Sequence, residues 1–209
     1  MQSTVLPDRA RTLLDFWFGP PGDPDRERHR EIWFKSTDEF DTALRREFLA
    51  DYEAAAAGSL DEWEASGEGA LALVLMLDQV PRNIFRGTPR AYATDAAARA
   101  AADRALARGF DMMVPPAWRL FFYMPFHHSE NLTDQRRSVA LSATLPRRNP
   151  DRRGSLRRYG CPYVEVIERF GRFPHRNEIL GRQSTPEEVA FLAECTQRRE
   201  QSFQDGTSD

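Results

Sequence analysis

The chain has 209 residues, of which 41% are hydrophobic and 29% charged, and its formal net charge is −3. This length can build one sizeable core, and the composition is that of a globular protein rather than a disordered one. Because phosphate binding requires a basic surface, the slightly acidic balance argues against nucleic acid as a partner.

Membrane insertion and export are not expected. The longest apolar run, residues 70–77, is far shorter than the roughly 20 residues that cross a bilayer. No basic segment followed by an apolar one opens the chain. Cys161 and Cys195 form neither a disulfide framework nor a metal-type spacing, so a reducing cytoplasm is the expected location.

Breaker and capping residues divide the first half of the chain into helices. A helix is predicted over residues 8–18, where it meets a run of glycine and proline. Ser36, with Glu39 three residues later, indicates a capping box at the start of the next helix. Ser66 is expected to cap a third helix, which Pro81 should kink or stop.

The second half also reads as helices. Thr94 opens an alanine-rich helix that Gly109 closes, and a short aromatic helix follows over residues 115–125. Residues 129–145 predict another helix, for which Ser129 is the expected N-cap. Apolar residues mark one face of a further helix over residues 159–170.

A last helix and the absence of strand patterns complete the fold prediction. Thr185, Pro186 and Glu188 combine an N-cap, a proline at the first helical position and a capping-box acid. No run alternates with period two for long enough to predict a strand. We predict an all-α, single domain over residues 1–209, with about eight or nine helices packed as antiparallel hairpins. Its core should span about residues 8–203, followed by a C-terminal tail at 204–209.

Segment 146–158 is rich in arginine, proline and glycine. Blocks of like charge are usually solvated, so a flexible loop is expected, with a lid that contacts an anion as the alternative. Its arginines are Arg147, Arg148, Arg152, Arg153, Arg157 and Arg158.

Segment 169–182 is the most informative part of the chain. Its polar residues alternate with Phe, Ile and Leu, and burying a charge without a partner is costly. The pattern therefore predicts a polar pocket with apolar walls. The polar residues of the segment are Arg169, Arg172, His175, Arg176, Asn177, Glu178 and Arg182.

Segments 77–89, 123–130 and 184–188, together with the opening segment 14–19, resemble a bacterial family known as domain of unknown function 924. The resemblance extends over residues 14–203. It implies a helical fold similar to that of tetratricopeptide proteins, and it implies no settled activity. The chain departs from the family pattern at His127, where an acid is usual, at Asn131, which replaces an aspartate, and at Tyr163, where histidine is common. These departures suggest a pocket adapted to a different ligand.

His128, Glu130 and His175 are the candidates for acid–base catalysis, because histidine titrates near neutrality and a neighbouring glutamate can orient it. The ligand-binding candidates are polar residues in the same motifs. Several are arginines, whose planar guanidinium matches a carboxylate or a phosphate. The candidates are Asp78, Gln79, Arg82, Asn83, Arg86, His127, Tyr163, Arg172, Arg176, Asn177 and Arg182.

Each candidate also has a structural interpretation. Asp78 can pair with Arg82 four residues later, and the other arginines can cap helices or cross-link them through Glu130 and Glu178. The His-His-x-Glu run at residues 127–130 fits no strong metal motif, so no metal is predicted. A glycine-rich phosphate loop and a dinucleotide fingerprint are both lacking, so no cofactor is predicted.

Two functions remain open. In the first, a pocket binds a small anionic molecule and carries out acid–base chemistry of the hydrolase or lyase type without a redox cofactor. In the second, a tetratricopeptide-like scaffold binds a protein partner and has no catalytic activity. The polar residues gather at helix breaks, which favours the pocket.

Overall fold

The computed structural model describes residues 5–145, 157–158 and 161–204. The basic segment predicted at 146–158 therefore lies outside the described residues, apart from Arg157 and Arg158, and so does the tail beyond Gln204. The described residues group into two compact units. The first holds residues 5–125 and 145, and the second holds residues 126–144, 157–158 and 161–204.

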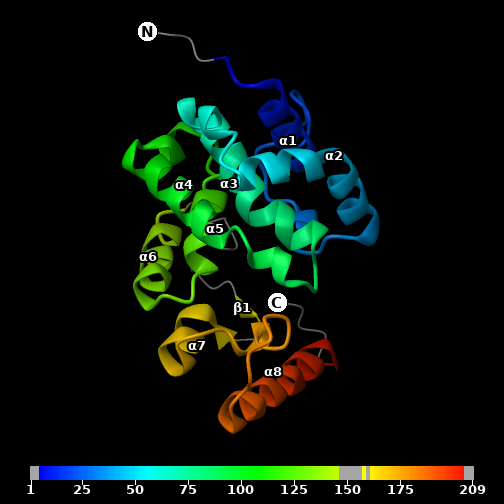
Figure 1. Ribbon diagram of the computed structural model, residues 1–209, viewed down its shortest axis with the longest axis vertical. Helices are drawn as coiled ribbons and strands as arrows, with labels where there is room; N and C mark the ends of the chain where they lie inside the picture. The colour runs from blue at the N-terminus through cyan, green and yellow to red at the C-terminus, as the bar shows by residue number, and fades with distance from the viewer. Residues whose placement is uncertain (1–4, 146–156, 159–160, 205–209) are drawn as a thin grey trace. The chain divides into compact units, whose positions relative to one another are not determined.

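The first unit is built around one central helix, α3 (Gly67–Ile84) (Figure 1). Residues 69–81 of α3 are all buried, and its neighbours α1, α2 and α4 all contact it. A helix that is apolar on every side has to lie inside a protein, which explains its central place. The other elements of this unit are α1 (Asp8–Phe18), η1 (Glu31–Trp33), α2 (Asp38–Ala56), η2 (Asp61–Ala65), η3 (Pro89–Tyr92), α4 (Asp95–Ala107), η4 (Phe110–Met113) and most of α5 (Leu120–His127).

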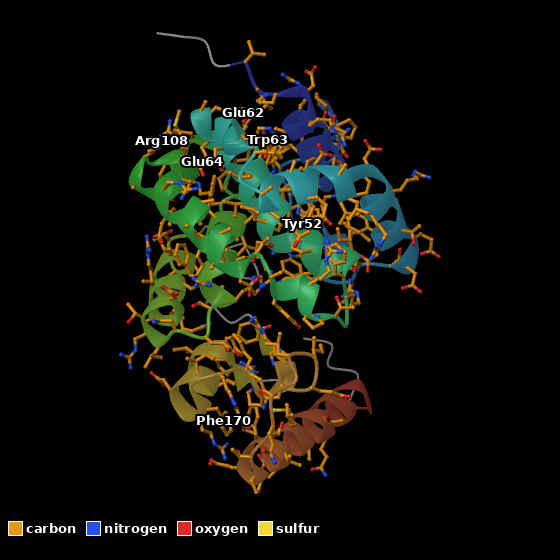
Figure 2. All side chains as sticks on the ribbon, in the orientation of Figure 1. Tyr52, Glu62, Trp63, Glu64, Arg108 and Phe170 are labelled. Atoms are coloured by element: carbon orange, nitrogen blue, oxygen red, sulfur yellow. The ribbon has the colours of Figure 1, made fainter. Side chains whose placement is uncertain are left out.

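Polar contacts at the outer edge of this unit join η2 to the end of α4 (Figure 2). Trp63 is buried, while the neighbouring Glu64 accepts a hydrogen bond from Arg104 Nε at 2.8 Å. Arg108 Nη1 donates to the backbone oxygen of Glu64 at 2.5 Å. The side chains of α4 therefore hold η2 in place from outside.

Of the two outcomes predicted for Pro81, a kink or a stop, the stop does not occur, because α3 continues to Ile84. A proline inside a helix leaves the carbonyl four residues earlier without its donor. Here that carbonyl belongs to Leu77, and the buried Thr94 hydroxyl donates to it at 2.6 Å. Thr94 therefore does not cap α4 with its side chain, because its hydroxyl serves α3.

Of three predicted N-caps, one is confirmed and two are wrong. Ser66 caps α3 as expected, since its hydroxyl accepts from Gly69 N at 3.1 Å. The predicted N-cap Ser36 is wrong by one residue, because Thr37 accepts from Phe40 N at 3.2 Å. Ser129 is not an N-cap either, because Asn131 caps α6 (Leu132–Ser142) through Thr133 N at 2.8 Å.

The second unit contains α6, α7 (Tyr163–Phe170), η6 (Pro174–Arg176) and α8 (Pro186–Gln204). Two strands of two residues each, β1 (Arg157–Arg158) and β2 (Cys161–Pro162), pair antiparallel. The sequence did not predict this pairing, because two residues are too few to show an alternating pattern. The apolar core of the unit consists of Val166, Ile167, Phe173 and Cys195.

The fold is all-α, as predicted, apart from this short strand pair. α1 and the capping box at Thr185 and Glu188 match the prediction closely. The aromatic helix α5 starts later than expected and includes Pro125, where the sequence predicted its end. No helix in the described part of the chain combines the length and the apolar character needed to cross a membrane.

Candidate functional site

The turn between α5 and α6 carries His127, His128 and Glu130, three of the predicted site residues. It is held from α6 by Gln135, a fully buried residue that the sequence analysis did not single out. Gln135 Nε2 donates to the backbone oxygens of His127 at 2.5 Å and Ser129 at 2.7 Å, with a longer contact of 3.4 Å to the oxygen of Phe126. The carbonyls of His127 and Ser129 lie at and just beyond the end of α5, where helical donors run out, and one amide group satisfies both.

Arg176 holds the same turn from the predicted motif at 169–182. Its Nη2 donates to the backbone oxygen of His128 at 2.9 Å, and its guanidinium lies 4.6 Å from the centre of the Phe173 ring. Arg176 is buried, with only 6% of its surface exposed. The predicted motifs at 127–130 and 169–182 therefore meet within the second unit.

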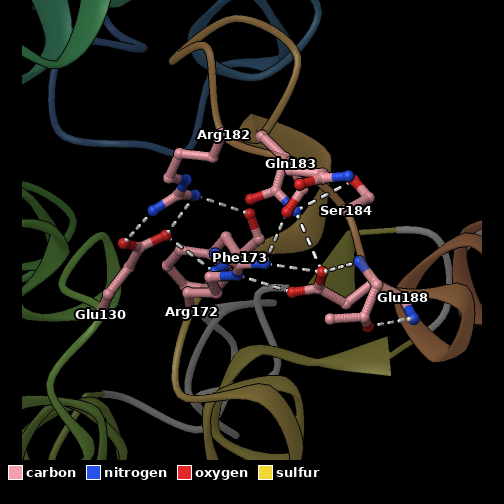
Figure 3. A network of polar contacts seen from close by, with 9 residues as sticks. Glu130, Arg172, Phe173, Arg182, Gln183, Ser184 and Glu188 are labelled. Atoms are coloured by element: carbon pink, nitrogen blue, oxygen red, sulfur yellow. Dashed lines mark hydrogen bonds and ion pairs between the residues drawn. The ribbon is translucent and has the colours of Figure 1, made fainter.

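Glu130 forms the other link between these two motifs (Figure 3). Its carboxylate accepts from Arg182 Nη1 at 2.7 Å and Nη2 at 2.9 Å, and from the Phe173 backbone N–H at 2.7 Å. Burial works against ionisation of this carboxyl group, but the hydrogen bonds from Arg182 and Phe173 outweigh it and lower its pKa. Glu130 is thus held as a carboxylate and acts as an anchor for the loop at 173–182.

Glu188, at the start of α8, is the centre of a second network (Figure 3). It accepts from Arg172 Nε at 2.7 Å and Nη2 at 2.8 Å, from Asn177 Nδ2 at 3.2 Å and from Thr185 N at 2.8 Å. These hydrogen bonds, above all those from Arg172, lower the pKa of Glu188 to about 2. The sequence analysis recognised Glu188 only as a capping residue. It named Glu178 as a possible partner of the arginines, and Glu178 is exposed.

His127 lies against two side chains of the second unit. Its Nε2 is 3.5 Å from the hydroxyl oxygen of Ser142, and its ring meets the ring of Tyr163 edge-on, with 6.3 Å between centres. His127 and Tyr163 are two of the three positions that the sequence analysis expects to depart from the family pattern, and their rings are neighbours in the structure. His175 is two residues after Phe173, and the centres of their rings are 5.3 Å apart.

The remaining predicted residues lie in the first unit, on α3 and just after it. Arg82 binds Asp78 Oδ1 at 3.0 Å and Asp95 Oδ1 at 2.7 Å; burial disfavours its charge, yet these two carboxylates raise its pKa. Gln79 Nε2 donates to Asp78 Oδ2 at 2.6 Å. The intrahelical pair of Asp78 and Arg82 is the one that the sequence predicted.

Arg86 and Asn83 continue this network to α2. Arg86 Nη2 donates to Asp41 Oδ2 at 2.8 Å, to Asn83 Oδ1 at 3.0 Å and to Ser36 Oγ at 2.5 Å. Asn83 Nδ2 donates to the backbone oxygen of Gln79, one helical turn earlier, at 2.9 Å. In this unit the predicted arginines join helices to one another.

The two units differ in what they bury. Of the thirteen buried polar or charged residues among the described ones, nine belong to the second unit, although it is the smaller. The nine residues are His127, His128, Ser129, Gln135, Ser138, Ser142, Arg176, Asn177 and Glu188.

No group of three or more His, Cys, Asp or Glu is arranged for a metal ion in the described residues.

Comparison with known proteins identifies the family. The sequence profile described as a bacterial protein of unknown function (DUF924) matches residues 13–196. The chain belongs to the DUF924 family. A solved structure of a protein of unknown function from Agrobacterium tumefaciens is 40% identical, with a TM-score of 0.76; the match covers 88% of this chain and 97% of that one. Among curated proteins no match was found.

Proposed function

We propose that the second unit of this DUF924 protein binds a small anionic molecule in the cytoplasm, and that histidine side chains carry out acid–base chemistry on it. The observation that carries the proposal is the turn at 127–130. Gln135, Arg176 and Arg182 all hold this turn, so its two histidines have a fixed backbone. Fixing functional side chains before the ligand arrives reduces the entropy lost on binding.

Arg176 is the proposed anion-binding residue. A buried guanidinium favours a nearby negative charge, and stacking on Phe173 fixes the plane of its donors. Arg172 and Arg182 are assigned a structural role instead, because each forms an ion pair through two donors, Arg172 with Glu188 and Arg182 with Glu130. The ligand would therefore meet one arginine and the histidines of the turn rather than a clamp of three arginines.

The acid–base roles fall to His128 and His175. Glu130 was also a candidate, but a carboxylate that accepts three hydrogen bonds and has a lowered pKa is a poor proton donor at neutral pH. Its proposed role is to hold the loop that carries His175 and Arg176. The chemistry would be of the hydrolase or lyase type and would require no redox cofactor.

Titration calorimetry with inorganic phosphate and with succinate tests the proposal. Wild-type protein should bind one of them at millimolar or lower concentration, and Arg176→Gln should weaken binding at least tenfold. Arg136→Gln is the matched control, because Arg136 is an exposed arginine that pairs with Glu168 on the surface of the same unit. Circular dichroism establishes that each variant is folded.

If Arg176→Gln does not fold, His128→Gln and His175→Gln take its place, since neither removes a guanidinium from the interior. Binding that is equally strong in all three variants, or no binding of either anion to the wild type, would contradict the proposal.

A protein-interaction scaffold is the second candidate function, and the first unit favours it. Arg82 and Arg86 both serve as links between helices, as the arginines of a purely structural helical array would. The family's implied likeness to tetratricopeptide proteins points the same way. Affinity capture with the full chain, compared with Arg86→Ala, tests it. A partner whose mass is identified and that binds the purified protein supports the scaffold, whereas a monomer that retains nothing specific counts against it.

A further inference from the structure

Helix α6 buries an unusual set of residues. Its buried positions are Gln135, Ser138 and Ser142, and each of the three is entirely inaccessible to solvent. They are spaced by three and four residues, so they lie on one face of the helix. A helix normally turns apolar residues inward, and a buried polar group costs free energy unless it has a hydrogen-bond partner.

Close packing does not explain this face, because the protein solves that problem differently elsewhere. Helix α4 buries Ala98, Ala101, Ala102 and Ala105, and these small side chains let neighbours approach without any polar group. Alanine at positions 138 and 142 would serve close approach equally well. The Gln135 amide and the Ser142 hydroxyl therefore call for another reason.

Gln135 points to a ligand. Its Nε2 is directed at the carbonyls of His127 and Ser129, which fixes the orientation of the amide, since a flipped amide would place oxygen against oxygen. Its Oε1 is then an acceptor that receives no hydrogen bond within the described part of the chain. Next to it on this face, the Ser142 hydroxyl reaches His127 Nε2 only at 3.5 Å, the outer limit of a hydrogen bond.

We propose that the buried face of α6 recognises hydroxyl groups of the ligand, so that the bound molecule is a hydroxylated anion. A ligand hydroxyl can donate to Gln135 Oε1 and accept from the hydroxyl of Ser142, which a bare anion cannot do. His127, in contact with Ser142, joins this face to the turn that carries the proposed anion site. This inference rests on the proposed function and adds the chemical class of the ligand.

The test compares two phosphate esters of the same charge and chain length, glycerol 3-phosphate and propyl phosphate, by titration calorimetry on the full chain. Wild-type protein should bind glycerol 3-phosphate at least tenfold more tightly. A site built to pair with hydroxyl groups loses affinity when they are missing. Ser142→Ala should bring that ratio towards one and leave the affinity for propyl phosphate unchanged.

The outcomes separate the two proposals. Equal affinity of wild-type protein for both esters overturns the inference and leaves the proposed anion site standing. Binding of neither ester, together with no binding of phosphate or succinate, overturns both. A ratio that Ser142→Ala retains also overturns the inference. Gln135→Met is an independent variant that should lower the ratio as well, and if it does not fold, Ser142→Ala still decides.

Discussion

Helices α3 and α6 show two ways of using a buried face. In α3, thirteen consecutive residues from Gly69 to Pro81 are buried, and most of them are apolar. In α6 the buried positions are a glutamine and two serines. The first pattern gains free energy from removing apolar surface from water, and the second gains little from it. The contrast shows that α3 buries mainly apolar surface, whereas α6 buries polar side chains, among them Gln135, which holds the turn before the helix.

The largest expected effect comes from removing apolar volume from α3. Leu75→Ala should lower the free energy of unfolding by about 2–5 kcal/mol, because a fully buried leucine leaves a cavity. Urea denaturation followed by tryptophan fluorescence measures it, since all four tryptophans belong to the first unit. In α6, Ser142→Ala should change stability by less than about 1 kcal/mol. A loss from Ser142→Ala as large as that from Leu75→Ala would remove the distinction between the two helices.

Glu188 should contribute the next largest effect, and this effect depends on pH. Its pKa in the folded protein is about 2, below its ordinary value of 4.5, so its stabilisation is complete above about pH 5 and fades as the pH falls towards 2. Glu188→Gln should cost about 1.5–3 kcal/mol at pH 7, because it weakens charged hydrogen bonds to Arg172. Urea titrations followed by circular dichroism at pH 7, 4 and 2 should show the two proteins converging. A difference that does not depend on pH would show that charge is not the cause.

Two glycines in the first turn of α3 provide a matched pair with a smaller effect. At Gly69 an added Cβ would collide with the backbone oxygen of Trp63, whereas at Gly67 it would lie 3.4 Å from Met113 and Phe110. Gly69→Ala should therefore cost about 1–3 kcal/mol. Gly67→Ala should be neutral, or stabilising by up to about 1 kcal/mol, because alanine favours helix. Fluorescence-detected unfolding compares them, and equal changes would mean that the contact with Trp63 adjusts freely.

The smallest effect is expected on the outer face of α6. Arg136 and Glu168 form an ion pair of 3.0 Å in which both side chains are exposed. Such pairs contribute between about 0 and 1 kcal/mol and weaken with salt. Arg136→Ala should stay within this range in denaturation experiments at low and high salt. A larger loss would mean that α6 depends on its surface charges and would weaken the view that its buried face has a separate purpose.

Much of the fold could be predicted because helix caps and helix breakers depend on residues that are close together in the sequence. The breaker run after α1, the cap at Ser66 and the box at Thr185 and Glu188 act over three or four residues, and each was correct. The end of α3 was missed, because the sequence cannot show that Thr94, seventeen residues beyond Leu77, supplies the bond that Pro81 removes. That compensation depends on tertiary contact.

The candidate site was predicted only in part, for the same reason. Glu130, Arg176 and Arg182 were named from their residue types, and the structure brings them together. Gln135 was not singled out, because a single glutamine in a polar helix does not show from the sequence that it will be buried. A helical plot of residues 132–142 would have shown that Gln135, Ser138 and Ser142 share a face, but burial of that face becomes visible only in three dimensions.

The bond from Thr94 to the Leu77 carbonyl also has an evolutionary consequence. It makes position 94 depend on position 81, because the carbonyl lacks its own helical donor only when proline stands four residues after it. Relatives that retain this proline should keep a hydroxyl-bearing residue at the equivalent of 94, and those that have lost it should tolerate valine or alanine there. The two positions would then vary together across the family, although one lies inside α3 and the other just before α4.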